Sequence, residues 1–221
     1  MRKPAAISKC IIVSMVCALF VIIFCAINPV GAQEVPEQVI QAAEKGLLEF
    51  LNQFQNMMEK GAGFRVNELG IDSDCFSQGI HLEKPFQVNR LTRETLSDYK
   101  NTPIENIIVK TDLWYFPVCF NGKAKTVLLV DKLKGSWQAV GIGSAPLARE
   151  LGKVLKAWPL DEGFTPTLIC YGYKKHFFTI PQQGAYNLTA IDFSNKDSDY
   201  VVLNDAETVL SKLAQSVLED Q

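Results

Sequence analysis

The sequence predicts an α+β fold: an antiparallel sheet (two three-stranded blocks) with a long N-terminal helix, a central helix and a C-terminal helix. Three observations support this class. The predicted elements run in the order helix, strand, helix, three strands, helix, three strands, helix. Strands and helices do not alternate one by one, as they do in parallel βαβ folds. The dipeptide Asn121-Gly122, which favours a tight hairpin, joins two of the strands.

The first predicted helix covers residues 36–59. Its apolar residues recur at steps of three and four, which is the period of an amphipathic helix. Pro36 suits a first helical position, and the glycine-rich segment 61–63 is expected to end the helix. We interpret the apolar stripe as a face that packs on the core.

The next segments predict a strand at 85–91 and then the first three-stranded block, an antiparallel meander over residues 112–142. Thr92 is the expected N-cap of a short helix between them. Pro117 lies inside the first strand of the meander. Because proline removes a hydrogen bond from the ladder, we expect that strand at an edge of the sheet.

The C-terminal half repeats this arrangement. Ser144 is expected to cap the central helix, and a second block of three strands is predicted at 165–193. The last helix is expected to begin at Asn204 or Asp205, since Asn204 and Glu207 have the spacing of a capping box.

The N-terminus has the pattern of a secretory signal. Three basic residues and no acidic residue accompany an apolar run at residues 10–27, and small or compact residues precede Gln33. We expect residues 1–32 to be the signal peptide, cleaved after Ala32, and residues 33–221 to form a single α+β globular domain. The apolar run is also near the length of a membrane span, so an uncleaved N-terminal anchor is the alternative.

Charge and composition exclude several function classes. The chain carries 22 basic and 24 acidic residues, and removing residues 1–32 removes three basic residues and no acidic one. This mildly acidic balance, with lysines scattered along the chain, argues against nucleic acid as a partner. Beyond residues 10–27 no apolar run is long enough to span a bilayer. We therefore expect membrane contact only through that segment, if the signal is uncleaved.

Three cysteines remain after the signal: Cys75, Cys119 and Cys170. Export permits disulfides, and Cys119 and Cys170 each lie in an apolar, aromatic run that is typical of a strand. We expect these two either to form a disulfide with each other across neighbouring strands or to be small buried side chains.

A Cys/His pair is the catalytic alternative that the residues suggest. Cys75 or Cys170 would be the nucleophile, and His176 follows Cys170 across a predicted turn. Cys75 lies beside Asp72 and Asp74, whose negative charges should raise the pKa of its thiol. A nucleophilic cysteine needs a lowered pKa, so this setting argues against Cys75. Sequence motifs of serine hydrolases and P-loop proteins are absent from the chain.

Three residues are candidates for binding. Trp114 and Tyr115 are adjacent in a predicted strand, where they are either core residues or a platform for a peptide or glycan on an exposed sheet face. The free amides around Ser144 could bind a small anion at the helix start. The two histidines, His81 and His176, lack a metal-ligand spacing, so we expect no metal and no cofactor.

These observations predict an exported protein, periplasmic or extracellular, that acts as a non-enzymatic binding or accessory module of the cell envelope. Its expected partner is a protein, a peptide or an envelope component, which the edge expected at Pro117 could bind by strand addition. The alternative function is a small exported hydrolase or thiol enzyme that uses a Cys/His pair. The alternative location is a single-pass membrane anchor.

Overall fold

The computed structural model describes residues 34–60, 79–172, 175–182, 185–190 and 204–219. All of these belong to one compact unit, Glu34–Gln221. The predicted signal peptide and Cys75 lie outside the described residues, as does the acidic segment before Cys75. Among the described residues, no helix combines the length and the apolar character that a membrane crossing requires.

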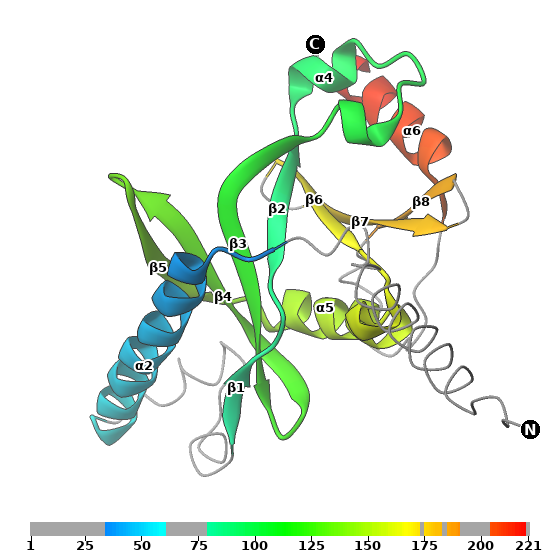
Figure 1. Cartoon of the computed structure of the whole chain (residues 1–221). Coiled ribbons are helices and arrows are strands. Elements are labelled where there is room, and N and C mark those ends of the chain that lie inside the picture. The colour runs from blue at the N-terminus through cyan, green and yellow to red at the C-terminus, as the bar shows by residue number, and fades with distance from the viewer. Residues whose placement is uncertain (1–33, 61–78, 173–174, 183–184, 191–203, 220–221) are drawn as a thin grey trace, which may run out of the picture. The chain divides into compact units, whose positions relative to one another are not determined.

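A single sheet connects all described strands, and helices pack against it (Figure 1). The strand order is β5-β4-β3-β2-β6-β7-β8-β9, and β1 lies beside β3. The strands are β1 (Ile80–Leu82), β2 (Phe86–Leu91), β3 (Val109–Phe120), β4 (Lys123–Leu133), β5 (Ser136–Gly143), β6 (Thr167–Tyr171), β7 (Lys175–Gln182), β8 (Ala185–Ala190) and β9 (Asn204–Asp205). The α-helices are α2 (Glu37–Glu59), α4 (Arg93–Ser97), α5 (Ala145–Ala157) and α6 (Ala206–Glu219).

The α+β class is confirmed, but the sheet is mixed and not purely antiparallel. The two predicted meanders, β3-β4-β5 and β6-β7-β8, are joined by β2, which pairs antiparallel with β3 and parallel with β6. A parallel pair needs a long crossover connection. Here the crossover contains the whole first meander and α5, so the two partners are far apart in sequence and no simple βαβ pattern marks them.

The predicted hairpin turn is present. Asn121 and Gly122 have φ angles of 49° and 68°, and the second turn of the meander, Lys134 and Gly135, has φ angles of 51° and 84°. Positive φ at both central residues is what a type I′ turn requires. Glycine at the second position adopts this conformation without steric cost, so the hairpin forms where the dipeptide predicted it.

Pro117 lies in an interior strand, so the predicted edge position is wrong. β3 pairs with β4 on one side and with β1 and β2, end to end, on the other. The carbonyl of Pro117 accepts a hydrogen bond from the Glu83 amide at 2.9 Å, in the short gap between β1 and β2. In an antiparallel ladder the N–H and C=O of a residue face the same neighbour. The missing N–H of Pro117 therefore faces that gap, where the ladder is already interrupted.

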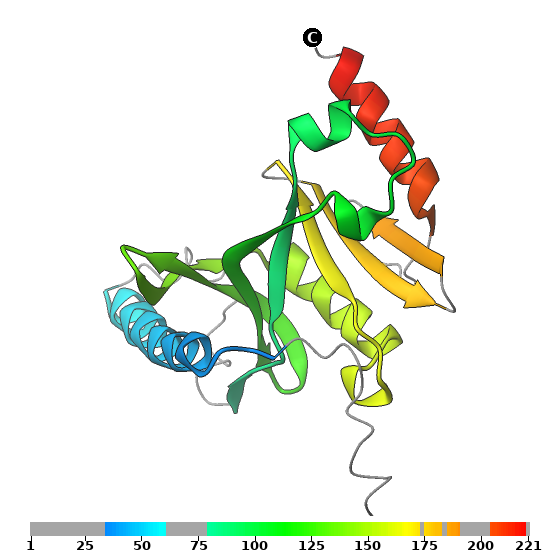
Figure 2. The same ribbon diagram turned by 45° about the horizontal axis from the view of Figure 1, so that its top comes forward.

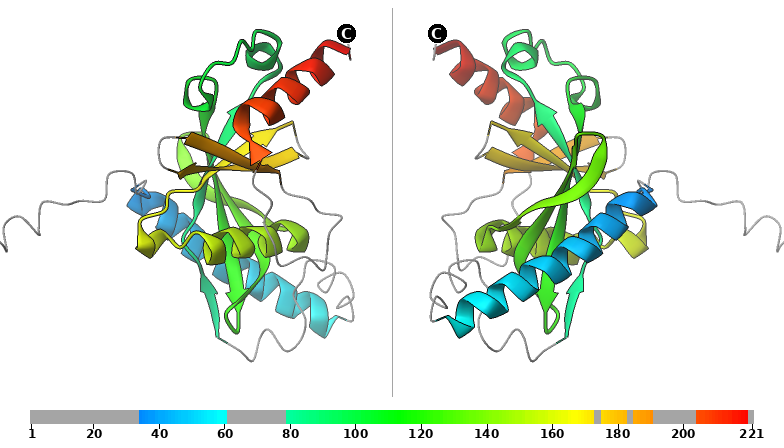
Figure 3. Two further views of the ribbon diagram at one scale, coloured as in Figure 1. Left: turned by 90° about the vertical axis from the view of Figure 1, so that its right-hand side faces the viewer. Right: turned by 90° about the vertical axis from the view of Figure 1, so that its left-hand side faces the viewer.

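Helices cover both faces of the sheet. On β4, Val127 packs in the cluster of α5 while the next residue, Leu128, packs in the cluster of α2, because side chains of a strand alternate between faces. Figure 3 shows α2 and α5 on opposite sides of the strands. At the other end of the sheet α6 lies beside α4 (Figure 2). Its cluster includes Ile169, whereas Leu168 packs with α5.

The helix starts agree with the sequence in part. Thr92 caps α4 through a capping box with Thr95. Ser144 occupies the N-cap of α5, but it has a left-handed backbone (φ 62°) and its side chain makes no capping hydrogen bond. At α6 the capping carboxylate belongs to Asp205, which accepts from the amide and hydroxyl of Thr208 at 2.8 and 2.9 Å. Of the two expected starts, Asn204 and Asp205, the structure has the second, and the cap is this carboxylate in place of the expected box between Asn204 and Glu207.

Candidate functional site

In the part of the chain that the structure describes, two clusters of polar and thiol side chains lie on the sheet, and each is built around a cysteine that lies opposite a histidine. The first, which we call the Cys170 cluster, consists of Arg90, Tyr115, Cys170 and His176. The pairing register places Arg90 of β2 and His176 of β7 on either side of Cys170 in β6. Residues directly opposite each other across strands project from the same face. Tyr115 of β3 completes the cluster, with its ring 6.2 Å from that of His176.

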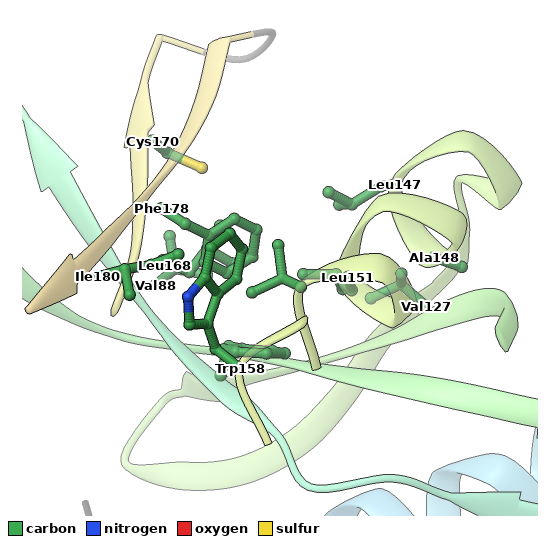
Figure 4. Close-up of a cluster of buried hydrophobic side chains, with 12 residues drawn as sticks. Val88, Val127, Leu147, Ala148, Leu151, Trp158, Leu168, Cys170, Phe178 and Ile180 are labelled. Atoms are coloured by element: carbon green, nitrogen blue, oxygen red, sulfur yellow. The ribbon is translucent and has the colours of Figure 1, made fainter. Parts of the chain in front are cut away.

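The Cys170 cluster lies at one end of the hydrophobic core that packs against α5. Cys170 is 7% exposed and His176 is 8% exposed. Phe178 and Val88, which lie in the next row of the same face, are almost fully buried. Figure 4 shows Cys170 next to this hydrophobic cluster, above Phe178. The pair that sequence reasoning proposed, Cys170 and His176, is therefore brought together, but in a largely water-free environment.

Burial governs the chemistry of this cluster. It raises the pKa of the Cys170 thiol to about 12, although the Arg90 charge and a hydrogen bond with Tyr115 act in the opposite direction. Burial, and then the proximity of Cys170, raise the pKa of Tyr115 to about 12 as well. Both groups keep their protons at neutral pH. A nucleophilic cysteine needs a lowered pKa. The Cys170 cluster therefore has the residues of a thiol enzyme, but its cysteine is a protonated thiol and not a thiolate.

The second cluster, which we call the Cys119 cluster, consists of His81, Glu83 and Cys119. His81 of β1 lies directly opposite Cys119 of β3. The Nε2 atom of His81 is 3.2 Å from Oε1 of Glu83, and the potential ligand atoms of all three residues lie within 4.8 Å of one another. Burial, the Glu83 charge and a hydrogen bond to Glu83 together raise the pKa of Cys119 to about 11.

The predicted disulfide between Cys119 and Cys170 is not formed. Both cysteines are free and buried. Their register explains this, since Cys119 lies opposite His81 in β1 and Ala124 in β4, whereas Cys170 lies between Arg90 in β2 and His176 in β7. The two strands that carry them, β3 and β6, are separated in the sheet by β2. Each thiol is accordingly a small side chain within its own cluster.

The predicted aromatic platform is not assembled on one face. Trp114 is 2% exposed and packs in the core under α2, whereas Tyr115 points to the opposite face and is half-buried in the Cys170 cluster. Ser144 is exposed at the start of α5, where its carbonyl accepts from the amide of Ala148 at 3.0 Å.

Sequence reasoning assigned no role to Arg90 or Glu83, and it considered His81 only to reject it as a metal ligand. Strand pairings between distant segments place Arg90 beside Cys170 and His81 beside Cys119. The signal that was available is the alternation in 81–83, which puts a histidine and a carboxylate on one side of an extended segment. No protein-family model, curated protein or solved structure matches this chain.

Proposed function

We propose that this chain acts by binding a partner and not by catalysis, as a binding or accessory module of the cell envelope. The observation that carries the proposal is the state of Cys170, a buried thiol that lies opposite a buried histidine. With its pKa raised to about 12, it is a poor nucleophile at neutral pH. This weighs against the alternative, an exported thiol enzyme built on Cys170 and His176.

Thiol alkylation tests this part of the proposal directly. The full chain is treated with iodoacetamide at neutral pH, and each cysteine is quantified by peptide mass spectrometry, first native and then in denaturant. We expect native Cys170 to react at least about 100-fold more slowly than the unfolded thiol, because burial both blocks access and holds the proton. Rapid alkylation of native Cys170 would establish a reactive thiolate and return the enzyme as the better function.

The surface that we propose for the partner is the outer edge of β5. This strand ends the sheet order and, in the part of the chain that the structure describes, pairs only with β4. The register shifts between Leu129 and Val130, which makes Val140 the extra residue of a bulge. Val140 is 41% exposed, and Leu133, which lies opposite Ser136 at the start of β5, is 46% exposed. An extended peptide segment could add to such an edge through backbone hydrogen bonds, with these apolar side chains giving selectivity.

A photo-crosslinking residue at Val140, introduced into the full chain in its own host, tests this surface. Leu218, an exposed apolar residue of α6, is the matched control position. We expect an adduct from position 140 and none from 218. A synthetic peptide of the crosslinked segment should then bind the purified chain, and Val140→Lys should weaken that binding about tenfold or more, since it places a charge on the apolar contact. Equal crosslinking at both positions, or a peptide that binds Val140→Lys unchanged, would refute the β5 surface.

Export remains part of this proposal and has its own test. The mass of the protein recovered from the host envelope should correspond to a chain that begins at Gln33, which is the expected outcome of cleavage after Ala32. A mass that includes residues 1–32 would instead support the anchored alternative.

A further inference from the structure

We propose that His81, Glu83 and Cys119 form a binding site for a transition-metal ion of the Zn²⁺ type. The three side chains offer one imidazole nitrogen, one carboxylate oxygen and one sulfur, all within 4.8 Å of one another. Ligand atoms around a tetrahedral zinc ion lie roughly 3 to 4 Å apart, as follows from bond lengths of about 2.0 to 2.3 Å. Nε2 of His81 and Oε1 of Glu83 are already 3.2 Å apart. Small side-chain movements would therefore suffice to close the site.

The backbone holds the ligands in place before any ion binds. His81 and Cys119 are directly opposite each other in the β1–β3 ladder, so their side chains leave the same face at a fixed separation. The amide of Glu83 bonds to the carbonyl of Pro117 at 2.9 Å, which ties the third ligand to the same strand as Cys119. A site whose ligands are preorganised loses less conformational entropy on binding.

The ligand set selects the class of metal. A thiolate and an imidazole suit Zn²⁺ and its neighbours in the transition series, whereas Mg²⁺ and Ca²⁺ prefer sites made of oxygen ligands. On binding, the S–H bond of Cys119 breaks, its proton passes to solvent and a sulfur–metal bond forms. A bound cation stabilises the thiolate strongly enough to overcome the burial that otherwise keeps this thiol protonated.

The exposure of the ligands indicates how an ion would enter. Cys119 is 3% exposed, Glu83 is partly buried and His81 is exposed. The ion would approach from the side of His81 and complete its coordination at the buried sulfur. Three protein ligands leave the fourth tetrahedral position for water. The Cys170 cluster lacks this arrangement, because its additional neighbours are a guanidinium and a phenol in place of a carboxylate.

Zinc and cobalt titrations of the full chain, after removal of metal with a chelator, test the proposal. We expect one equivalent of Zn²⁺ to bind, measured by competition with a chromophoric chelator. Co²⁺ at the same site should give a sulfur-to-cobalt charge-transfer band and the d–d bands of a tetrahedral complex. His81→Gln should lower Zn²⁺ affinity by about 100-fold or more, as expected for the loss of one of three ligands. This position is exposed, so the variant should keep the circular dichroism spectrum of the parent.

Cys119→Ser and Cys170→Ser form the matched pair of variants. Each replaces the sulfur of a buried thiol that faces a histidine with oxygen. Of this pair, only Cys119→Ser should abolish the charge-transfer band and weaken Zn²⁺ binding. A third variant, Glu83→Gln, should weaken Zn²⁺ binding but keep the charge-transfer band. The proposal is overturned if the parent chain binds Zn²⁺ no more tightly than the double variant His81→Gln, Cys119→Ser does. It is equally overturned if the band survives in Cys119→Ser and disappears in Cys170→Ser.

Discussion

The two cysteines that the structure describes each lie opposite a histidine on an antiparallel neighbour, yet their surroundings differ. Cys119 has a carboxylate beside it and an exposed histidine. Cys170 has a tyrosine and an arginine beside it, and its histidine is buried. The difference shows that a Cys–His pair does not define a chemistry by itself. The third neighbour and the access of water decide whether the pair suits a cation or completes a core.

The largest contrast that this comparison predicts concerns the burial of the apolar residues in the strands that carry the two pairs. Phe178 lies under the Cys170 cluster and is fully buried. It packs edge-on against Phe86, with the two ring centroids 5.3 Å apart. Ile80 precedes His81 in β1, so its side chain leaves the opposite face of the sheet, where it packs in the α2 cluster and is only partly buried. Phe178→Ala should lower the free energy of unfolding by about 3 to 5 kcal/mol and Ile80→Ala by about 1 kcal/mol. Urea denaturation of both variants measures this contrast, and equal losses would show that the two strands are equally well packed.

Alkaline pH should distinguish the two thiols by their contribution to stability. An unfolded cysteine loses its proton near pH 9, whereas native Cys170 keeps it to about pH 12 and native Cys119 to about pH 11. Above pH 9 the unfolded state binds fewer protons than the native state, so stability falls as pH rises. The slope is at most about 1.4 kcal/mol per pH unit for each thiol.

Denaturation at several pH values above about 8 checks this dependence. Cys170→Ala should flatten the decline, and Cys119→Ala should flatten it over a shorter pH interval. A decline that is equally steep in the parent chain and both variants would mean that neither thiol holds its proton more tightly when folded.

A smaller effect is expected from the hydroxyl of Tyr115. Its hydrogen bond lowers the pKa of Cys170 against the larger effect of burial. Tyr115→Phe should raise that pKa further and cost about 1 kcal/mol of stability, the usual net value of one hydrogen bond. Cys119 should titrate unchanged. The pH dependence of alkylation, read for each cysteine by mass spectrometry, separates the two thiols, and a shift at Cys119 would contradict the assignment.

The smallest effect is the most specific, because it differs in sign between the clusters. Glu83 raises the pKa of Cys119 and Arg90 lowers that of Cys170. Glu83→Gln should therefore increase alkylation of metal-free Cys119 by about two- to fivefold at a fixed pH. Arg90→Gln should decrease alkylation of Cys170 by a similar or smaller factor, since solvent screens an exposed charge. Changes of the same sign at both thiols would show that access, and not charge, controls their reactivity.

The sequence predicted most of the local structure. The apolar period over 36–59 corresponds to α2, Asn121-Gly122 forms the hairpin turn, and Thr92 caps its helix. These features depend on interactions between near neighbours in the chain, which periodicity, backbone preference and capping chemistry describe well.

The order of strands could not be predicted in the same way. The sequence predicts an edge position for Pro117 because most prolines in sheets lie there, yet a gap between two partner strands accommodates the missing amide equally well. Arg90 and Cys170 meet only because β2 and β6 are parallel neighbours. Strand β1 has three residues, too few for a period to appear. The Cys119 cluster therefore depends on pairings that no local pattern encodes.

Strand β2 has a consequence for how the protein folds and unfolds. Among the described strands it is the seam between the two meanders, since the backbone ladder that joins them runs through its pairings with β3 and β6. The β6 partner is synthesised only after the first meander and α5, so the seam closes late and over a long loop, which slows folding. Once β2 is paired on both sides, it couples the two halves. Separating either β3 or β6 from β2 leaves an unpaired strand edge on the half that remains folded. Denaturation should consequently proceed as one cooperative transition and not as two.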